Sequence, residues 1–98
     1  MSETQPLLQP YRMGEYQLAN RVVMAPLTRC RATNPDLAPT DLHTQYYSQR
    51  ASAGLIITEG TWISRDAIGW HDVPGLFTET QVRGWSAVTA PRSCHRTR

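Results

Sequence analysis

The chain has 98 residues, of which 40% are hydrophobic and 18% are charged, and its formal net charge is +2. This length suits one small domain, and the composition is too ordinary for a disordered tail. No stretch approaches the roughly 20 apolar residues of a membrane span, and the polar first nine residues lack the apolar segment of a signal peptide. We therefore expect a cytoplasmic protein with no membrane partner.

The basic excess gathers at the end of the chain, in Arg92, Arg96 and Arg98. No aromatic side chains are interleaved with these arginines, so we do not expect a nucleic-acid partner. The two cysteines, Cys30 and Cys94, lie far apart and fit no metal-ligand spacing. Two free thiols in a reducing compartment are the expected state.

The first elements are short. Residues 1–10 are expected to form a flexible arm, and residues 11–20 alternate weakly around Gly14, which predicts a small hairpin. The run 22–25 is continuously apolar and begins with two β-branched residues. This pattern is typical of a strand that is buried on both faces, as strands are in the parallel sheets of α/β proteins.

A polar loop follows, and then a helix is predicted over about residues 41–52, with Thr40 or Asp41 as its cap. Gly54 is expected to end this helix in the left-handed conformation. The apolar run 55–58 predicts a second buried strand. Strand, helix and strand in this order form a βαβ unit, so the two strands should be parallel neighbours.

A second helix start is marked by Thr78 and Gln81, which have the spacing of a capping box. Phe77 and Val82 flank the cap in the positions of a hydrophobic staple. One apolar stripe should follow along this helix, through Val82, Trp85 and Val88.

Four segments carry a family resemblance: NRVVMAPLTR at 20–29, YYSQR at 46–50, GLIITEGT at 54–61 and GWHDVPG at 69–75. Together they resemble the start of the old yellow enzymes, including plant oxophytodienoate reductases and bacterial N-ethylmaleimide-type reductases. The likeness runs from about residue 8 to residue 88. It implies an α/β fold that is the N-terminal portion of a (β/α)8 TIM barrel, with about two of its eight strands, and FMN at the C-terminal ends of the strands.

The resemblance also implies an activity and a site. Full-length relatives are FMN-dependent oxidoreductases in which NAD(P)H reduces the flavin, which then passes hydride to an activated alkene such as a small enone. Ala25, Pro26 and Leu27 would lie beside the flavin ring. Thr28 would hydrogen-bond the flavin carbonyl next to N5, and Gly60, where many relatives carry alanine, would offer its backbone N–H to the same edge. Without the resemblance, Thr28 would be interpreted as a residue at the end of a strand whose hydroxyl forms hydrogen bonds with nearby groups.

The other polar residues are interpreted as structural or surface residues. Glu59 ends the second strand, where acid–base work is conceivable, but a structural hydrogen bond is the favoured interpretation. Arg29 and Arg31 are interpreted as ion-pairing or surface residues, because the phosphate-binding arginines of the family lie much later. His43 is expected on a helix face, and His71 lacks the partners of a metal ligand.

No catalytic residue can be assigned, because the carbonyl-binding pair, the tyrosine proton donor and the phosphate arginines of the family cannot be placed here. We expect residues 11–90 to be the barrel part and residues 91–98 an aberrant basic tail, in a truncated ene-reductase that is inactive alone. Two alternatives stay open. The chain could complete an active assembly with another chain, or act as a non-enzymatic protein-interaction fragment, associating or aggregating through exposed strand edges.

Overall fold

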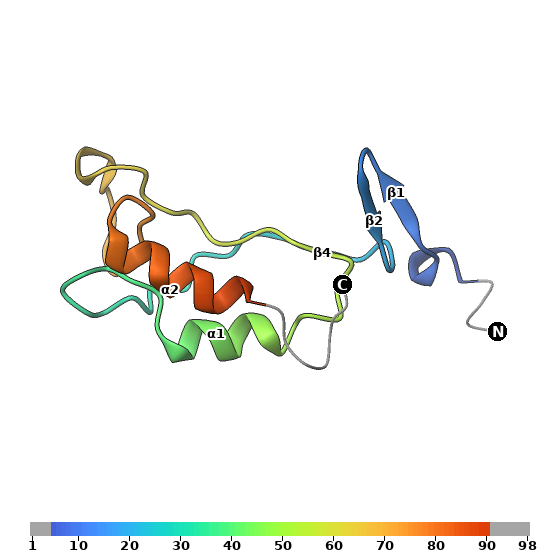
Figure 1. Ribbon diagram of the computed structural model, residues 1–98, viewed down its shortest axis with the longest axis horizontal. Helices are drawn as coiled ribbons and strands as arrows, with labels where there is room; N and C mark the ends of the chain where they lie inside the picture. The colour runs from blue at the N-terminus through green and yellow to red at the C-terminus, as the bar shows by residue number, and fades with distance from the viewer. Residues whose placement is uncertain (1–4, 91–98) are drawn as a thin grey trace.

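The computed structural model describes residues 5–90, so the predicted tail with Cys94 and the first four residues of the expected arm lie outside it. Two helices and two small sheets make up this part of the chain (Figure 1). Their order is η2 (Pro6–Leu8), β1 (Tyr11–Met13), β2 (Tyr16–Leu18), β3 (Val23–Met24), α1 (Asp41–Ser48), β4 (Leu55–Ile56), η3 (Arg65–Ala67) and α2 (Glu79–Thr89).

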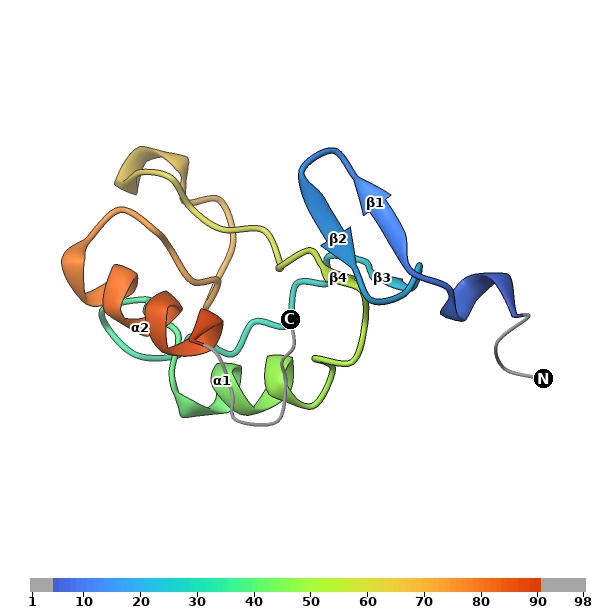
Figure 2. The same cartoon turned by 45° about the vertical axis from the view of Figure 1, so that its right-hand side comes forward.

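The predicted hairpin is confirmed. Strands β1 and β2 pair antiparallel, and Gly14 takes the left-handed φ of 59° at the turn between them. The hairpin stands apart from the two helices, as both views show (Figures 1 and 2). A backbone hydrogen bond joins the segment before the hairpin to the residues after it: the Arg21 N–H donates to the Leu7 carbonyl over 2.9 Å.

The predicted parallel strand pair is also confirmed. Strands β3 and β4 pair in register, with Val23 opposite Leu55 and Met24 opposite Ile56. The expectation of burial on both faces was wrong, because Val23 is 49% exposed and Ile57 is 47% exposed. The reason is that the described residues place no third strand beside this pair, so only part of its surface is covered.

The prediction for Gly54 was also wrong. Helix α1 ends at Ser48, and residues 49–53 continue in turns, such as the one closed by the bond from the Ala53 N–H to the Arg50 carbonyl. Gly54 does not have a positive φ. It is required for space, because a Cβ at this position would overlap the carbonyl group of Asn20.

The core lies between the two helices and the loops that precede them. Helices α1 and α2 run side by side (Figure 1). The rings of Tyr47 on α1 and Trp85 on α2 lie 6.1 Å apart, and the Trp85 indole N–H donates to the Gly75 carbonyl over 3.1 Å. The other buried hydrophobic side chains in this region are small: Ala32, Ala38 and Val73.

The capping box at the start of α2 is confirmed. The Thr78 hydroxyl accepts from the Gln81 N–H, and Gln81 Oε1 accepts from the backbone N–H groups of Thr78 and Phe77. The predicted stripe needs correction, because Val82 is about half exposed while Gln81 is buried beside Trp85. A glutamine can take the core-facing position because its Nε2 also donates to the Asp36 carbonyl, which satisfies its polar atoms.

Neither helix in residues 5–90 is long and apolar enough to cross a membrane.

Helix α1 begins with a capping box that uses a histidine. The Thr40 N–H donates to His43 Nδ1 over 2.9 Å, and the Thr40 hydroxyl in turn accepts a hydrogen bond from a backbone N–H in the first turn of the helix. His43 is 3% exposed on the helix, facing inward. Burial lowers the pKa of His43 below its ordinary value, while the nearby Glu59 acts in the opposite direction.

A pH dependence of stability follows from this cap. The unfolded chain protonates His43 near the ordinary pKa of about 6.5, whereas the folded chain resists protonation until a lower pH. The contribution of neutral His43 to the free energy of unfolding is therefore complete above about pH 6.5 and is lost as the pH falls through the lower pKa of the folded state. Urea denaturation at a series of pH values measures this loss.

The matched control is His43→Gln, because glutamine at this position accepts the same bond from the Thr40 N–H and does not titrate. This variant should lose less stability than the wild type between neutral and mildly acidic pH. Equal losses in the two proteins would show that His43 does not carry the effect.

Candidate functional site

The ends of the two parallel strands bring the expected flavin residues together. Thr28 follows β3 and Gly60 follows β4, and since the strands are parallel both segments leave the sheet at one edge. The two residues line one cavity of about 570 Å³. The prediction that they lie together at this edge is confirmed, whereas Ala25, Pro26 and Leu27 connect β3 to Thr28 and are not among the described residues that line the cavity.

The rest of the cavity wall comes from the loop after β4. Thr61, Trp62, Trp70 and Val73 line it together with Thr28 and Gly60. Trp62 is fixed at its backbone, since its N–H donates to the Pro74 carbonyl and its carbonyl accepts from the Leu76 N–H. The sequence patterns did not assign these four residues to the site. The available signal was the presence of two tryptophans in a loop that directly follows a strand.

Indole rings beside hydroxyl and backbone amide groups are the surroundings that a flat conjugated ring system prefers. Trp70 is 63% exposed, so its ring remains free to be covered by a ligand. Trp62 Nε1 is buried and has no hydrogen-bond partner among the described residues. The cavity therefore combines an apolar wall with a few polar groups that can orient a ligand.

A pair of hydrogen bonds anchors the end of β4 to helix α1. The Tyr47 hydroxyl donates to Glu59 Oε2 over 2.9 Å, and the Glu59 N–H donates back to the same hydroxyl oxygen over 3.1 Å. Burial raises the pKa of Tyr47, so its hydroxyl stays protonated as a donor; the bond from the Glu59 N–H acts in the opposite direction, and the bond to the Glu59 carboxylate adds to the rise. Glu59 thus makes the structural hydrogen bond expected of it, and it fixes the backbone one residue before Gly60.

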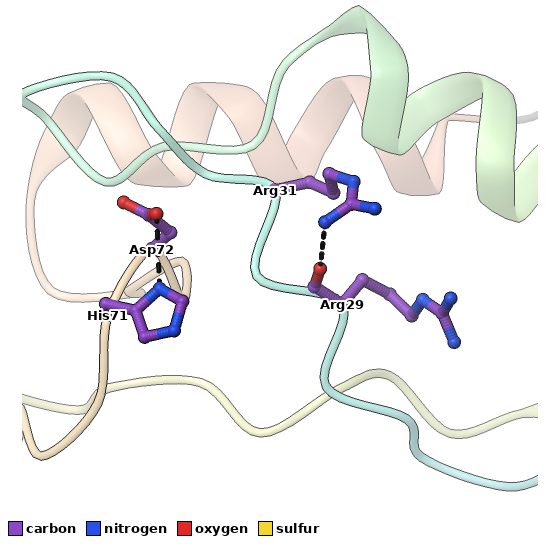
Figure 3. A network of polar contacts seen from close by, with 4 residues as sticks. All are labelled: Arg29, Arg31, His71 and Asp72. Atoms are coloured by element: carbon purple, nitrogen blue, oxygen red, sulfur yellow. Dashed lines mark hydrogen bonds and ion pairs between the residues drawn. The ribbon is translucent and has the colours of Figure 1, made fainter.

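The loop after Thr28 carries two arginines that the sequence predicted to be ion-pairing or surface residues. Both are exposed, and neither forms an ion pair within residues 5–90. The Arg31 guanidinium donates to the Arg29 carbonyl over 2.9 Å, while His71 Nδ1 lies 3.3 Å from the Asp72 carboxylate in the facing loop (Figure 3). Cys30, between the arginines, has a φ of 56°, a strained value for a residue with a side chain.

Among the described residues, no group of three or more histidine, cysteine or acidic side chains could hold a metal ion. His71 contacts Asp72 through Nδ1 and the Trp70 ring through its own ring.

Replacing Tyr47 with phenylalanine should loosen the end of β4. Among the described residues, the change removes the only hydrogen bond to the Glu59 carboxylate and leaves both of its oxygens unpartnered. We expect a loss of about 1–3 kcal/mol in the free energy of unfolding, the usual cost of an unsatisfied buried polar group. Urea denaturation measures it.

Tyr46→Phe is the matched control, because the Tyr46 ring packs edge-on against Tyr47 and under Arg50 without a hydrogen bond from its hydroxyl. It should cost much less than Tyr47→Phe. If the two variants are equally stable, the Tyr47–Glu59 pair does not anchor the strand end.

Comparison with known proteins gives consistent matches. The sequence model of the NADH:flavin oxidoreductase / NADH oxidase family matches residues 6–91. A flavin oxidoreductase, hxnT, from Emericella nidulans is 48% identical over 93 residues, which cover 91% of this chain and 24% of that protein. The 12-oxophytodienoate reductase 1 of Oryza sativa subsp. japonica is 46% identical over 84 residues, which cover 85% of this chain and 22% of that protein.

Solved structures agree with these matches. A morphinone reductase variant in complex with tetrahydroNAD superposes with a TM-score of 0.80 at 49% identity, over 87% of this chain and 23% of that chain. An old yellow enzyme homologue from Zymomonas mobilis gives a TM-score of 0.80 at 46% identity, over 86% of this chain and 23% of that chain. The chain spans about a quarter of the length of these relatives.

Proposed function

Because the chain belongs to the NADH:flavin oxidoreductase / NADH oxidase family, whose old yellow enzyme members use FMN with NAD(P)H as reductant, we propose that its βαβ unit forms one edge of the flavin site of an ene-reductase. One observation carries the proposal: Thr28 and Gly60, which follow two parallel strands, line a single cavity. The observed unit is the kind of fragment that an incomplete (β/α)8 barrel would contain.

The residues present fit one edge of a flavin ring. A Cβ added to Gly60 would meet no atom within 4 Å, so the space in front of its backbone is open to a ligand. The Thr28 side chain is exposed in the same cavity and can donate to a ring carbonyl. When bound, FMN supplies the hydride chemistry, accepting from NAD(P)H and reducing the alkene of a small enone.

The chain's own residues have three tasks in this proposal. The Thr28 hydroxyl and the Gly60 N–H orient the ring edge by hydrogen bonds. Ala25, Pro26 and Leu27 bring Thr28 to the ring through an extended backbone, and Trp62 and Trp70 shield the ring from water. The Tyr47–Glu59 pair holds the backbone next to Gly60 in place.

The phosphate end of FMN lacks a partner among the described residues of this cavity, because no arginine of residues 5–90 lines it. Phosphate binding depends on charge-assisted hydrogen bonds, which supply much of the affinity for such a cofactor. We therefore propose that residues 1–98 alone bind FMN weakly or not at all and reduce no alkene.

Protein association is the second candidate function, and the exposed aliphatic side chains of the strand pair favour it. Val23 and Ile57 are each about half exposed, and among the described residues the β3–β4 sheet pairs with no further strand. Free strand edges of this kind can pair with another polypeptide.

A chimera tests the flavin proposal. Residues 6–90 replace the matching segment of morphinone reductase, which superposes on this chain and is 49% identical to it. The chimera should bind FMN, turn yellow and oxidise NAD(P)H in the presence of cyclohexenone. Thr28→Val in the chimera should retain FMN while it lowers the flavin reduction potential and slows turnover, because the bond that stabilises the reduced ring is lost.

Residues 1–98 alone are the control and should show no enone-dependent turnover. A chimera with native circular dichroism that binds no FMN would contradict the assignment of Thr28 and Gly60. Retained FMN with an unchanged potential in Thr28→Val would remove Thr28 from the site.

A further inference from the structure

A second cavity lies on the other side of the same chain segments. It has a volume of about 290 Å³, and helix α1 supplies three of its seven described lining residues. Its lining residues are Arg29, Arg31, Leu42, His43, Tyr46, Arg50 and Glu59. The described lining of this cavity shares no residue with the lining of the cavity at Thr28 and Gly60.

Two buried polar atoms of this lining have no hydrogen-bond partner within residues 5–90. They are Nε2 of His43, a residue 3% exposed, and Oε1 of Glu59, a residue 2% exposed. His43 Nδ1 accepts from the Thr40 N–H, so the proton of the neutral ring lies on Nε2. The cavity wall therefore holds one unpaired donor and one unpaired acceptor, and buried groups of this kind normally have partners.

Three guanidinium groups line the same cavity without a carboxylate partner. Within residues 5–90, Arg29, Arg31 and Arg50 form no ion pair. Arg31 donates one bond to the Arg29 carbonyl, and Arg50 donates to the Tyr46 carbonyl and to the Gln49 side chain, so both keep N–H groups to spare. Against these three positive charges the lining offers a single carboxylate, that of Glu59.

We propose that this cavity binds a small oxyanion that carries its own hydroxyl group, of the class of hydrogen phosphate. The anionic oxygens accept from the arginines and from His43 Nε2, and the hydroxyl donates to Glu59 Oε1. An anion without a hydroxyl would leave the Glu59 oxygen unpaired and facing a like charge, and a cation would be repelled by the three arginines. The two unpaired groups and the arginines together thus select this chemical class.

The comparison of phosphate with sulfate tests the proposal. At about pH 8 both ions carry mainly two negative charges, but only hydrogen phosphate has a hydroxyl to donate. Titrations of the whole chain at constant ionic strength are followed by calorimetry and by the arginine side-chain signals in NMR spectra. Phosphate should bind at least about tenfold more tightly than sulfate, the factor expected from one hydrogen bond to a charged group.

Three variants locate the binding. Arg29→Gln should weaken phosphate and sulfate alike by about tenfold. Glu59→Gln should abolish the preference for phosphate, because a glutamine amide donates as well as accepts. Arg12→Gln on β1 removes the same charge outside the cavity and should leave both affinities unchanged.

Equal affinity for the two ions, absence of binding, or equal effects of Arg29→Gln and Arg12→Gln would each overturn the proposal. If Glu59→Gln lowers stability, the comparison of the two ions in the wild type and in Arg29→Gln still decides, because Arg29 is exposed.

Discussion

The parallel pairing of β3 with β4 is the constraint on which the rest of this structure depends. Only two residue pairs form the ladder, yet parallel strands must end at the same edge, so Thr28 and Gly60 come together although they lie 32 positions apart in the sequence. The pairing itself requires the close approach of Gly54 to Asn20, which no residue with a side chain permits. A short ladder is sufficient because helix α1 also holds the chain after β4, through the two hydrogen bonds between the Tyr47 hydroxyl and Glu59.

Beyond the ladder, successive residues of the two chain segments face two different cavities. Thr28 and Gly60 line one cavity, while their neighbours Arg29 and Glu59 line the other, as side chains of extended chains do when successive residues point to opposite sides. The first cavity is neutral with indole walls, and the second is strongly basic. Glu59 connects them, because its backbone positions Gly60 while its carboxylate faces the arginines. A change at Glu59 is therefore expected to reach both sites.

Local sequence patterns predicted where the helices, strands and turns lie, but they predicted less well which side chains pack in the core. The capping box at Thr78 and the hairpin at Gly14 follow from side-chain chemistry within a few residues, the parallel pair follows from the order strand, helix, strand, and all three are present. The misassigned residues are those decided by distant contacts. Gly54 serves a contact with Asn20 in place of a helix end, and Gln81 displaces Val82 from the core through its bond to Asp36. The tryptophans that line the cavity were not predicted, because their position depends on how the loop after β4 folds and no local sequence pattern specifies that.

Amide hydrogen exchange on residues 1–98, resolved by NMR, measures whether β3 and β4 are paired. We expect slow exchange for the N–H groups of Gly54 and Ile57, which donate to the carbonyls of Val22 and Met24 over 2.9 and 3.0 Å. We also expect contacts between the α-protons of β3 and the amide protons of β4 in the parallel pattern. Rapid exchange at both amides, or an antiparallel pattern of contacts, would contradict the claim that strand pairing brings Thr28 and Gly60 into one site.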